Sequence, residues 1–297
     1  MIVTRLKEGL GNQMFQYAAG ISLSLQKGTA FFFDDSIYTS ENWYSRKKIG
    51  REFGLGAFCL TGKPLDGWRR FCVLTLIRRR YFVLRVLLHA LGVPIALKYI
   101  CDTGVERKVD ERLQKCGNNI FLDGYWQTEN YFKSVRKVIL SEFTFRESPD
   151  AKNAALLSGI ISCDAVCVHV RRVDYTTPES LAIRGICRID YYREAVDYIT
   201  RRVRNPHFYI FSDDPAWVGL TFQGIDSVTM VTHNVGHRDA EDLRLMVHCK
   251  HFIIANSSFS WWAAWLGQYS EKIVVAPRRW MANGDDYDVV PDGWVRL

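Results

Sequence analysis

Two adjacent arginines, Arg171 and Arg172, follow an apolar run at 165–170 whose β-branched residues predict a buried strand. In open α/β sheets, ligands bind beyond the carboxyl ends of the strands, so this position favours a binding role. A guanidinium group stays charged at neutral pH, and its fork matches a diphosphate. Because neighbours on a strand point to opposite faces, we expect one arginine to reach the ligand. The other should pair with a carboxylate such as Asp174.

Carboxylates and hydroxyls follow two further predicted strands. One strand ends at Asp213 and Asp214, which would accept hydrogen bonds from a nucleobase or ribose, while Ser212 or Asp213 would cap the helix that follows. Another leads into Ser257 and Ser258, which open a helix whose positive end favours an anion. Together with the arginines, these groups match a nucleoside diphosphate ligand.

A glycine-containing stretch, GLGNQ at 9–13, lies between a predicted strand and a predicted helix, where phosphate-binding loops occur. Gly9 and Gly11 fit the start of a G-x-G-x-x-G motif, although Met14 occupies the third glycine position. Asp34 ends the next strand, near the place of a ribose-binding acid. An NAD(P)-dependent oxidoreductase is therefore one alternative.

Two amides in the same stretch, Asn12 and Gln13, support a different interpretation. They stand at the helix start and would donate hydrogen bonds to phosphate or sugar oxygens. A plain tight turn before a capped helix would explain the glycines equally well. A non-catalytic protein that binds a sugar nucleotide or a glycan is a further alternative.

The order of the predicted elements is typical of an α/β fold. Apolar strand-like runs alternate with helical stretches, which implies parallel sheets covered by helices. The stretch RESPD at 146–150 interrupts the pattern. We therefore expect two Rossmann-like domains that face a cleft, 1–148 and 149–297. The strands are expected at 2–5, 30–33, 120–123, 165–170, 207–211, 228–231, 252–255 and 272–276, and the helices at 14–26, 129–140, 190–204, 240–248 and 258–269.

Composition narrows the class of protein. A hydrophobic fraction of 48% with 13% aromatic residues supports packed cores and argues against wholesale disorder. The eight cysteines form no C-x-x-C pair and no zinc pattern, so they read as reduced thiols. The chain starts with MIVTRL and has no charged-then-apolar leader, from which we expect a cytoplasmic protein.

The positive charge is concentrated in one segment, 63–98, where eight basic residues face a single acid, Asp66. This net charge of +7 equals that of the whole chain, so the remainder is balanced. Its arginines alternate with large apolar residues, and no uncharged stretch has the roughly 20 residues of a membrane span. The segment is a helical insertion with solvated arginines or a basic amphipathic helix on an anionic membrane face. The charge is local and no nucleic-acid-binding signature is present, so we expect no nucleic acid partner.

The four motifs GLGNQMFQYA, HVRRVDY, FSDD and NSSFSWWAAWL resemble the bacterial α-1,2-fucosyltransferases of glycosyltransferase family 11. DGYWQTENYF (123–132) and EDLRLMVHCKHFIIANSSFSWW (241–262) are similar to the same family. The resemblance covers most of the chain and is weakest over 36–119. One departure is Val173, because the family usually has a glycine after the arginine pair. The resemblance implies a GT-B-like fold and inverting transfer of L-fucose from GDP-β-L-fucose. The implied acceptor is the 2-hydroxyl of a galactose-terminated glycan, in surface polysaccharide synthesis.

The resemblance also implies roles for individual residues. It assigns acceptor binding to the domain 1–148 and GDP-fucose binding to 149–297. Arg171 would contact the β-phosphate, Arg172 would be structural, and Asn12 would align donor and acceptor. The implied donor-binding residues are Gly11, His169, Arg171, Asp213, Asp214, Ser257, Ser258 and Phe259. The implied acceptor-binding residues are Gln13, Tyr125, Trp126 and Gln127.

The general base is open between Glu179 and Asp174, the acids nearest downstream of the arginines. A mechanism without a dedicated base is the alternative. Asp286-Tyr-Asp288 looks like a metal-binding D-x-D motif, but we expect a polar loop and no metal or cofactor, since arginine supplies the countercharge. The expected partners are GDP-fucose and a glycan acceptor. Peripheral contact of 68–97 with the inner face of the cytoplasmic membrane is a further expectation.

Overall fold

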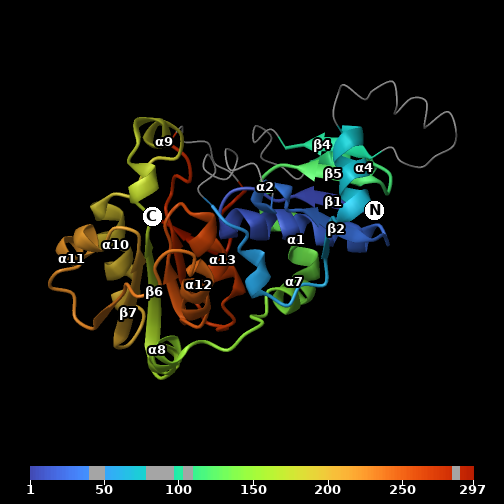
Figure 1. Ribbon diagram of the computed structural model, residues 1–297. Coiled ribbons are helices and arrows are strands. Elements are labelled where there is room, and N and C mark those ends of the chain that lie inside the picture. Colours follow the sequence, from blue (N-terminus) through green and yellow to red (C-terminus); the bar gives the residue numbers. More distant parts are fainter. Residues whose placement is uncertain (40–50, 78–96, 103–109, 283–287) are drawn as a thin grey trace, which may run out of the picture. The chain divides into compact units, whose positions relative to one another are not determined.

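The computed structural model describes residues 1–39, 51–77, 97–102, 110–282 and 288–297. The chain divides into two compact units, Met1–Thr144 and Phe145–Leu297 (Figure 1). The sequence placed the division after residue 148, and the structure has it after residue 144. Each unit is an α/β domain around a parallel sheet, which confirms the predicted fold class.

The described strands of the first unit form one five-stranded parallel sheet. Those predicted at 2–5 and 120–123 are confirmed, and they form neighbouring central strands. The two edge strands were not predicted, because one is only two residues long and the other is largely exposed. In sheet order the strands are β3 (Lys63–Pro64), β2 (Phe31–Asp34), β1 (Ile2–Arg5), β5 (Ile120–Asp123) and β4 (Lys98–Cys101).

Helices cover both faces of this sheet because side chains alternate along the strands. Ile2 and Leu122 lie in one apolar core with Ala19 and Leu23 of α1 (Leu10–Gln26). Val3 and Phe121 lie in a second core with Val73 of α4 (Gly67–Ile77). The remaining elements of the unit are α2 (Ser36–Thr39), η1 (Leu55–Ala57), α6 (Glu111–Lys115), η3 (Glu129–Tyr131), η4 (Lys133–Val135) and α7 (Arg136–Glu142).

The second unit contains a six-stranded parallel sheet in its described residues. Each strand predicted after residue 160 is present, with ends that shift by at most two residues. The added edge strand, β11, has only two residues and gave no sequence signal. In sheet order the strands are β11 (Val295–Arg296), β10 (Val274–Ala276), β9 (His251–Ile253), β6 (Asp164–Val170), β7 (Pro206–Ser212) and β8 (Val228–Val231).

The helices of this unit lie on both faces of the sheet, as Figure 1 shows. Val166, Val168 and Val170 of β6 pack in one core with α10, whereas His169 on the other face contacts α13. α11 follows β7, and α12 contacts both α8 and α13. No helix among the residues described is long and apolar enough to cross a bilayer. The helices of the unit are η5 (Val173–Tyr175), α8 (Ala151–Ile161), α9 (Pro178–Ile183), α10 (Ile189–Thr200), α11 (Pro215–Thr221), α12 (Asp239–Val247) and α13 (Ser258–Leu266).

Candidate functional site

Three adjacent parallel strands of the second unit bring the sequence motifs to one edge of the sheet. β6 lies between β9 and β7, with Val168 paired to both Ile253 and Ile210. The carboxyl ends of parallel strands meet at the same edge, which is where α/β proteins bind their ligands. The HVRRVDY, FSDD and NSSF motifs therefore converge there, as the sequence predicted.

Arg171 is held on one edge of its guanidinium group. Its Nε and Nη2 donate to the two carboxylate oxygens of Asp174 at 2.7 and 2.6 Å, and Nε lies 3.3 Å from Asp213 Oδ2. Nη1 has no partner among the residues described, and the side chain is 23% exposed. Since a guanidinium group presents five N–H donors, this arrangement leaves a second edge able to bind an anion.

Electrostatics reinforce the charge state of this arginine. Burial opposes its charge, but the hydrogen bonds and negative charge of Asp174, with that of Asp213, outweigh burial and raise the pKa of Arg171. His169 responds in the opposite sense, because burial and then the charge of Arg171 lower the pKa of His169 to about 3. Arg171 is therefore a permanent cation beside a neutral imidazole.

Arg172 pairs with a different aspartate from Arg171. The sequence predicted that the arginine turned away from the ligand pairs with a carboxylate such as Asp174. In the structure both arginines pair with aspartate: Arg171 with Asp174, and Arg172 Nε with Asp214 Oδ2 at 3.1 Å. The guanidinium group of Arg172 also lies over the ring of Trp217, with Cζ 4.3 Å from its centroid. The reason is that β6 ends at Val170 and the chain turns into η5, which brings Asp174 back to Arg171.

The carboxylates of the FSDD motif organise the backbone of the site. Asp213 accepts hydrogen bonds from the backbone N–H groups of Arg172 and Val173 at 2.9 and 3.2 Å. Asp214 caps α11 by accepting from Trp217 N at 3.1 Å, whereas the sequence favoured Ser212 or Asp213, which lie two and one residues earlier. Both predicted donor-binding acids thus already hold internal partners.

Two residues that received no role from the sequence connect the motifs. Tyr175 Oη donates to the backbone oxygen of Asn256 at 3.2 Å, which joins the arginine motif to the serine motif. The Asn256 amide donates to Arg184 O and Trp280 O at 2.8 and 3.2 Å. Both residues stand inside quoted motifs, but nothing in their types or spacing distinguishes a connecting residue from a binding one.

The start of α13 provides hydrogen-bond donors at the same edge of the sheet as the arginine motif. Ser257 is the N-cap but makes no capping hydrogen bond with its side chain, and Ser258 is half-buried. Phe259 packs against His169, with ring centroids 5.6 Å apart, while His169 Nδ1 is buried without a partner. The first N–H groups of a helix lack intrahelical acceptors, so this end carries partial positive charge.

In the first unit, the predicted residues Asn12 and Gln127 meet. Gln127 Nε2 donates to Asn12 Oδ1 at 2.6 Å, although 115 positions separate them in the sequence. This contact fixes the amide of Asn12 with its carbonyl oxygen toward Gln127, and Asn12 Nδ2 keeps no partner in the described structure. Gly11 is buried in the first turn of α1 beside it.

The turn that presents Gln127 is locally strained. Trp126 adopts a left-handed backbone conformation with φ of 54°, its ring is buried, and its indole N–H lacks a partner. Asp102 Oδ2 accepts from the backbone N–H groups of Tyr125 and Trp126 at 3.2 Å each, and a Cβ on Gly124 would collide with Asp102. Tyr125 stays 36% exposed, whereas Trp126 belongs to the core rather than to a surface platform.

Gln13 also departs from its predicted acceptor role. Its side chain is fully buried, and Nε2 donates to Glu8 O and Glu52 O at 2.9 and 2.8 Å. Its Oε1 accepts from Gly54 N at 2.9 Å. All three contacts fix the backbone around α1, because an amide with two donors and an acceptor can join several loops at once.

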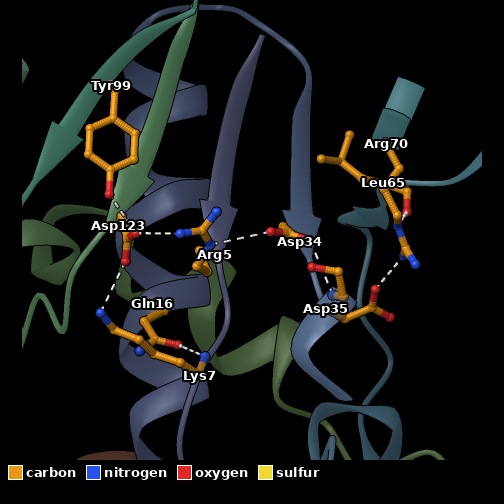
Figure 2. A network of polar contacts seen from close by, with 10 residues as sticks. Arg5, Lys7, Gln16, Asp34, Asp35, Leu65, Arg70, Tyr99 and Asp123 are labelled. Carbon is orange, nitrogen blue, oxygen red and sulfur yellow. Dashed lines mark hydrogen bonds and ion pairs between the residues drawn. The ribbon is translucent and has the colours of Figure 1, made fainter. Parts of the chain in front are cut away.

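Asp34, which a dinucleotide site would need, is committed elsewhere, as Figure 2 shows. It is fully buried, lies 3.4 Å from Arg5 Nε and accepts from Ser36 N at 3.1 Å. Arg5 and Lys7 further pair with Asp123, and Tyr99 Oη donates to the same carboxylate at 2.7 Å. The prediction that Asp34 is available for ribose is therefore wrong, since β1 places an arginine next to it.

Two predicted groups fall partly outside the described residues. Glu179 belongs to α9, which Thr177 caps, but its side chain lies beyond what the structure describes. In the Asp286-Tyr-Asp288 motif, residues 286 and 287 are likewise outside the described part. Within the described ranges, no cluster of histidine, cysteine, aspartate or glutamate has the arrangement of a metal site.

Comparison of the sequence with known proteins gives a consistent result. The sequence profile of "Glycosyl transferase family 11" matches residues 97–295. An Escherichia coli alpha-1,2-colitosyltransferase is 31% identical, covering 100% of this chain and 99% of that protein. The O-antigen biosynthesis glycosyltransferase WbnK, also from E. coli, is 32% identical over 98% of this chain and 99% of its own. Mouse galactoside 2-alpha-L-fucosyltransferase Sec1 is 28% identical over 50% of this chain and 43% of its own.

Solved structures with the same fold include NodZ, an alpha-1,6-fucosyltransferase whose crystals were soaked with GDP-fucose. It superposes with a TM-score of 0.51 at 17% identity, covering 89% of this chain and 91% of NodZ. The structure of NodZ from Bradyrhizobium gives the same TM-score. This likeness, with two parallel-sheet units, confirms the predicted GT-B-like fold class.

Proposed function

The chain belongs to glycosyl transferase family 11, and on that premise we propose that it transfers L-fucose from GDP-β-L-fucose to the 2-hydroxyl of a galactose-terminated glycan. The transfer proceeds with inversion at the anomeric carbon and requires no metal ion. Its similarity to an O-antigen biosynthesis glycosyltransferase supports a role in surface polysaccharide synthesis.

The observation that carries the proposal is the free edge of Arg171. One edge of the guanidinium group is fixed by Asp174, and Nη1 remains a donor. The acceptor hydroxyl attacks C1 of fucose while the bond from C1 to the β-phosphate oxygen breaks, so negative charge grows on the departing GDP. A preorganised cation at this point stabilises the transition state more than the bound substrate.

The start of α13 supports the same step. β9 and β6 are neighbouring parallel strands, and Phe259 contacts His169, so the N–H groups of α13 lie at the same sheet edge as Arg171. Partial positive charge at a helix start favours a phosphate, and the hydroxyl groups of Ser257 and Ser258 add donors. Because the pKa of His169 is lowered to about 3, its imidazole is a neutral hydrogen-bonding group for the nucleotide.

Asp174 acts in this scheme as a positioning residue for Arg171 rather than as the base. Its carboxylate accepts two hydrogen bonds from Arg171, and a carboxylate so paired is a poor proton acceptor. The proton of the acceptor hydroxyl passes to Glu179 or directly to solvent. An unchanged pH–rate profile in Glu179→Gln would assign the proton to solvent.

Asn12 and Gln127 contribute from the acceptor-side unit. With its oxygen held by Gln127 at 2.6 Å, Asn12 keeps Nδ2 as a hydrogen-bond donor. That donor suits an oxygen of the acceptor glycan. Gln127 therefore positions the amide of Asn12. The strained turn at Trp126, held by the carboxylate of Asp102, in turn positions Gln127.

Transfer of colitose is the second candidate, because an E. coli alpha-1,2-colitosyltransferase matches the whole chain. The deciding experiment supplies either GDP-fucose or an activated colitose with a panel of galactose-terminated acceptors, in excess chelator. NMR of the product should show an α-1,2 linkage. Donor hydrolysis without transfer, or GDP binding without turnover, would replace the proposal by a binding function.

A further inference from the structure

The exposed face of α4 carries an unusual pair of aromatic residues. Trp68 and Phe71 are 74% and 58% exposed, and their rings stack with centroids 5.3 Å apart. They are three positions apart, so they share one face of the helix. We define the α4 surface as this pair with the neighbouring cations Lys63 and Arg69, both of which are exposed.

Packing of the domain does not require these aromatic rings outside. The opposite face of α4 already covers the sheet, where Val73 is buried and Leu74 packs against the core around Val3. A single exposed apolar residue is ordinary, but two adjacent stacked rings at a helix start form a contact surface. The helix therefore has one face for the core and a second, apolar face with nothing against it in the described structure.

The charges beside the rings select the partner. Neither Lys63 nor Arg69 has an acidic partner among the described residues, and the Arg69 guanidinium group lies 5.3 Å from the centroid of the Phe32 ring. Arg70 is different, because it pairs with Asp35 and donates to Leu65 O. Exposed Asp66 is the one acid in the sequence of the segment 63–98, whose net charge is +7. An anionic surface is complementary to this charge.

We propose that the α4 surface docks the protein on an anionic lipid bilayer, with Trp68 and Phe71 at the level of the lipid headgroups. The amphipathic ring of tryptophan partitions to this interface, the phenylalanine ring adds apolar area that inserts beside it, and lysine and arginine bind anionic headgroups next to them. The described residues of α4 and β3 suffice for this contact. The inference stands independently of the proposed reaction, because it concerns neither the donor site nor turnover.

The test is co-sedimentation of the full chain with phosphatidylcholine vesicles that contain or lack phosphatidylglycerol. We expect binding to the anionic vesicles alone, and weaker binding as salt rises. The double substitution Trp68→Ser with Phe71→Ser should weaken binding by about tenfold or more, since it removes the inserted apolar area. The matched control is Leu220→Ser on the second unit, which removes a 77% exposed apolar residue and should bind as wild type.

Folding and oligomeric state separate the remaining outcomes. Circular dichroism should show an unchanged fold, and if the aromatic variant unfolds, Lys63→Gln with Arg69→Gln tests the same surface through its charge. Binding that is equal for wild type and variants, or absent for wild type, overturns the proposal. A wild-type dimer that becomes a monomer on loss of Trp68 and Phe71 would instead identify this surface as an interface between two copies of the chain.

Discussion

Replacement of Arg171 by lysine tests the proposed role of its guanidinium group while the positive charge is retained. Arg171 makes two short hydrogen bonds to Asp174, at 2.7 and 2.6 Å, and a 3.3 Å contact with Asp213. A lysine ammonium group is a single point of charge and cannot hold a carboxylate on one edge and a diphosphate on the other. It will remain with Asp174 and Asp213 and leave the departing GDP without its donor.

The size of the effect follows from the contacts that are lost. Removal of one preorganised donor to a developing negative charge costs about 3 kcal/mol in the transition state, or about a 100-fold fall in kcat. The fall in kcat should exceed any rise in the KM for donor, because the contact strengthens as GDP leaves. The loss of the bidentate pair should also destabilise the fold by about 1–2 kcal/mol.

Arg172→Lys is the matched control. Arg172 is 21% exposed and Arg171 is 23% exposed, and each pairs with aspartate. The two substitutions should therefore lower the melting temperature similarly, while only Arg171→Lys lowers kcat strongly. Initial rates of GDP release with a galactose-terminated acceptor measure kcat, and calorimetry with GDP measures binding. Turnover of Arg171→Lys within a few-fold of wild type, or equal losses in both variants, would refute the assigned role.

Three further predictions concern other residues. Gln127→Glu should lower kcat about tenfold, because a carboxylate only accepts hydrogen bonds and will turn the Asn12 amide away. In an Asn12→Ala background the same change should cause no further loss of kcat. Additive losses in the double variant would contradict a positioning role for Gln127. Burial raises the pKa of Asp242 to about 7, above its unfolded value, so its contribution to stability is lost as pH rises toward neutrality. Asp242→Asn should thus flatten the melting temperature between about pH 4 and pH 7, and a profile that still falls like wild type would contradict this. Excess chelator should leave turnover unchanged, whereas restoration of lost turnover by added Mg²⁺ would reinstate a metal role for Asp286 and Asp288.

The sequence predicted the central architecture because buried parallel strands are continuous apolar runs. The strands at β1, β5 and β8 have the expected ends, and β6 begins one residue earlier than expected. The strands β3 and β11 were not predicted from the sequence, because they have two residues each and take their conformation from pairing with a neighbour. The helix expected at 129–140 is instead two short 3-10 turns followed by α7. Local propensity does not encode such interruptions.

The motifs lie at the strand ends where the sequence placed them, but the partners within them could not be assigned in advance. Which arginine pairs with Asp174 depends on the path of the turn after Val170, which the sequence left open. The residues of the Asn12–Gln127 contact are 115 positions apart in the sequence, and no local sequence pattern predicts it. Gln13 and Trp126 look like surface donors by type, yet tertiary packing buries both.

The most direct measurement is a crystal structure of the protein with GDP. The account predicts Arg171 Nη1 within hydrogen-bond distance of the diphosphate, with Asp174 still on the Nε edge and the first N–H groups of α13 facing the same phosphate. A guanidinium group that remains turned from the phosphates while GDP is bound would contradict it.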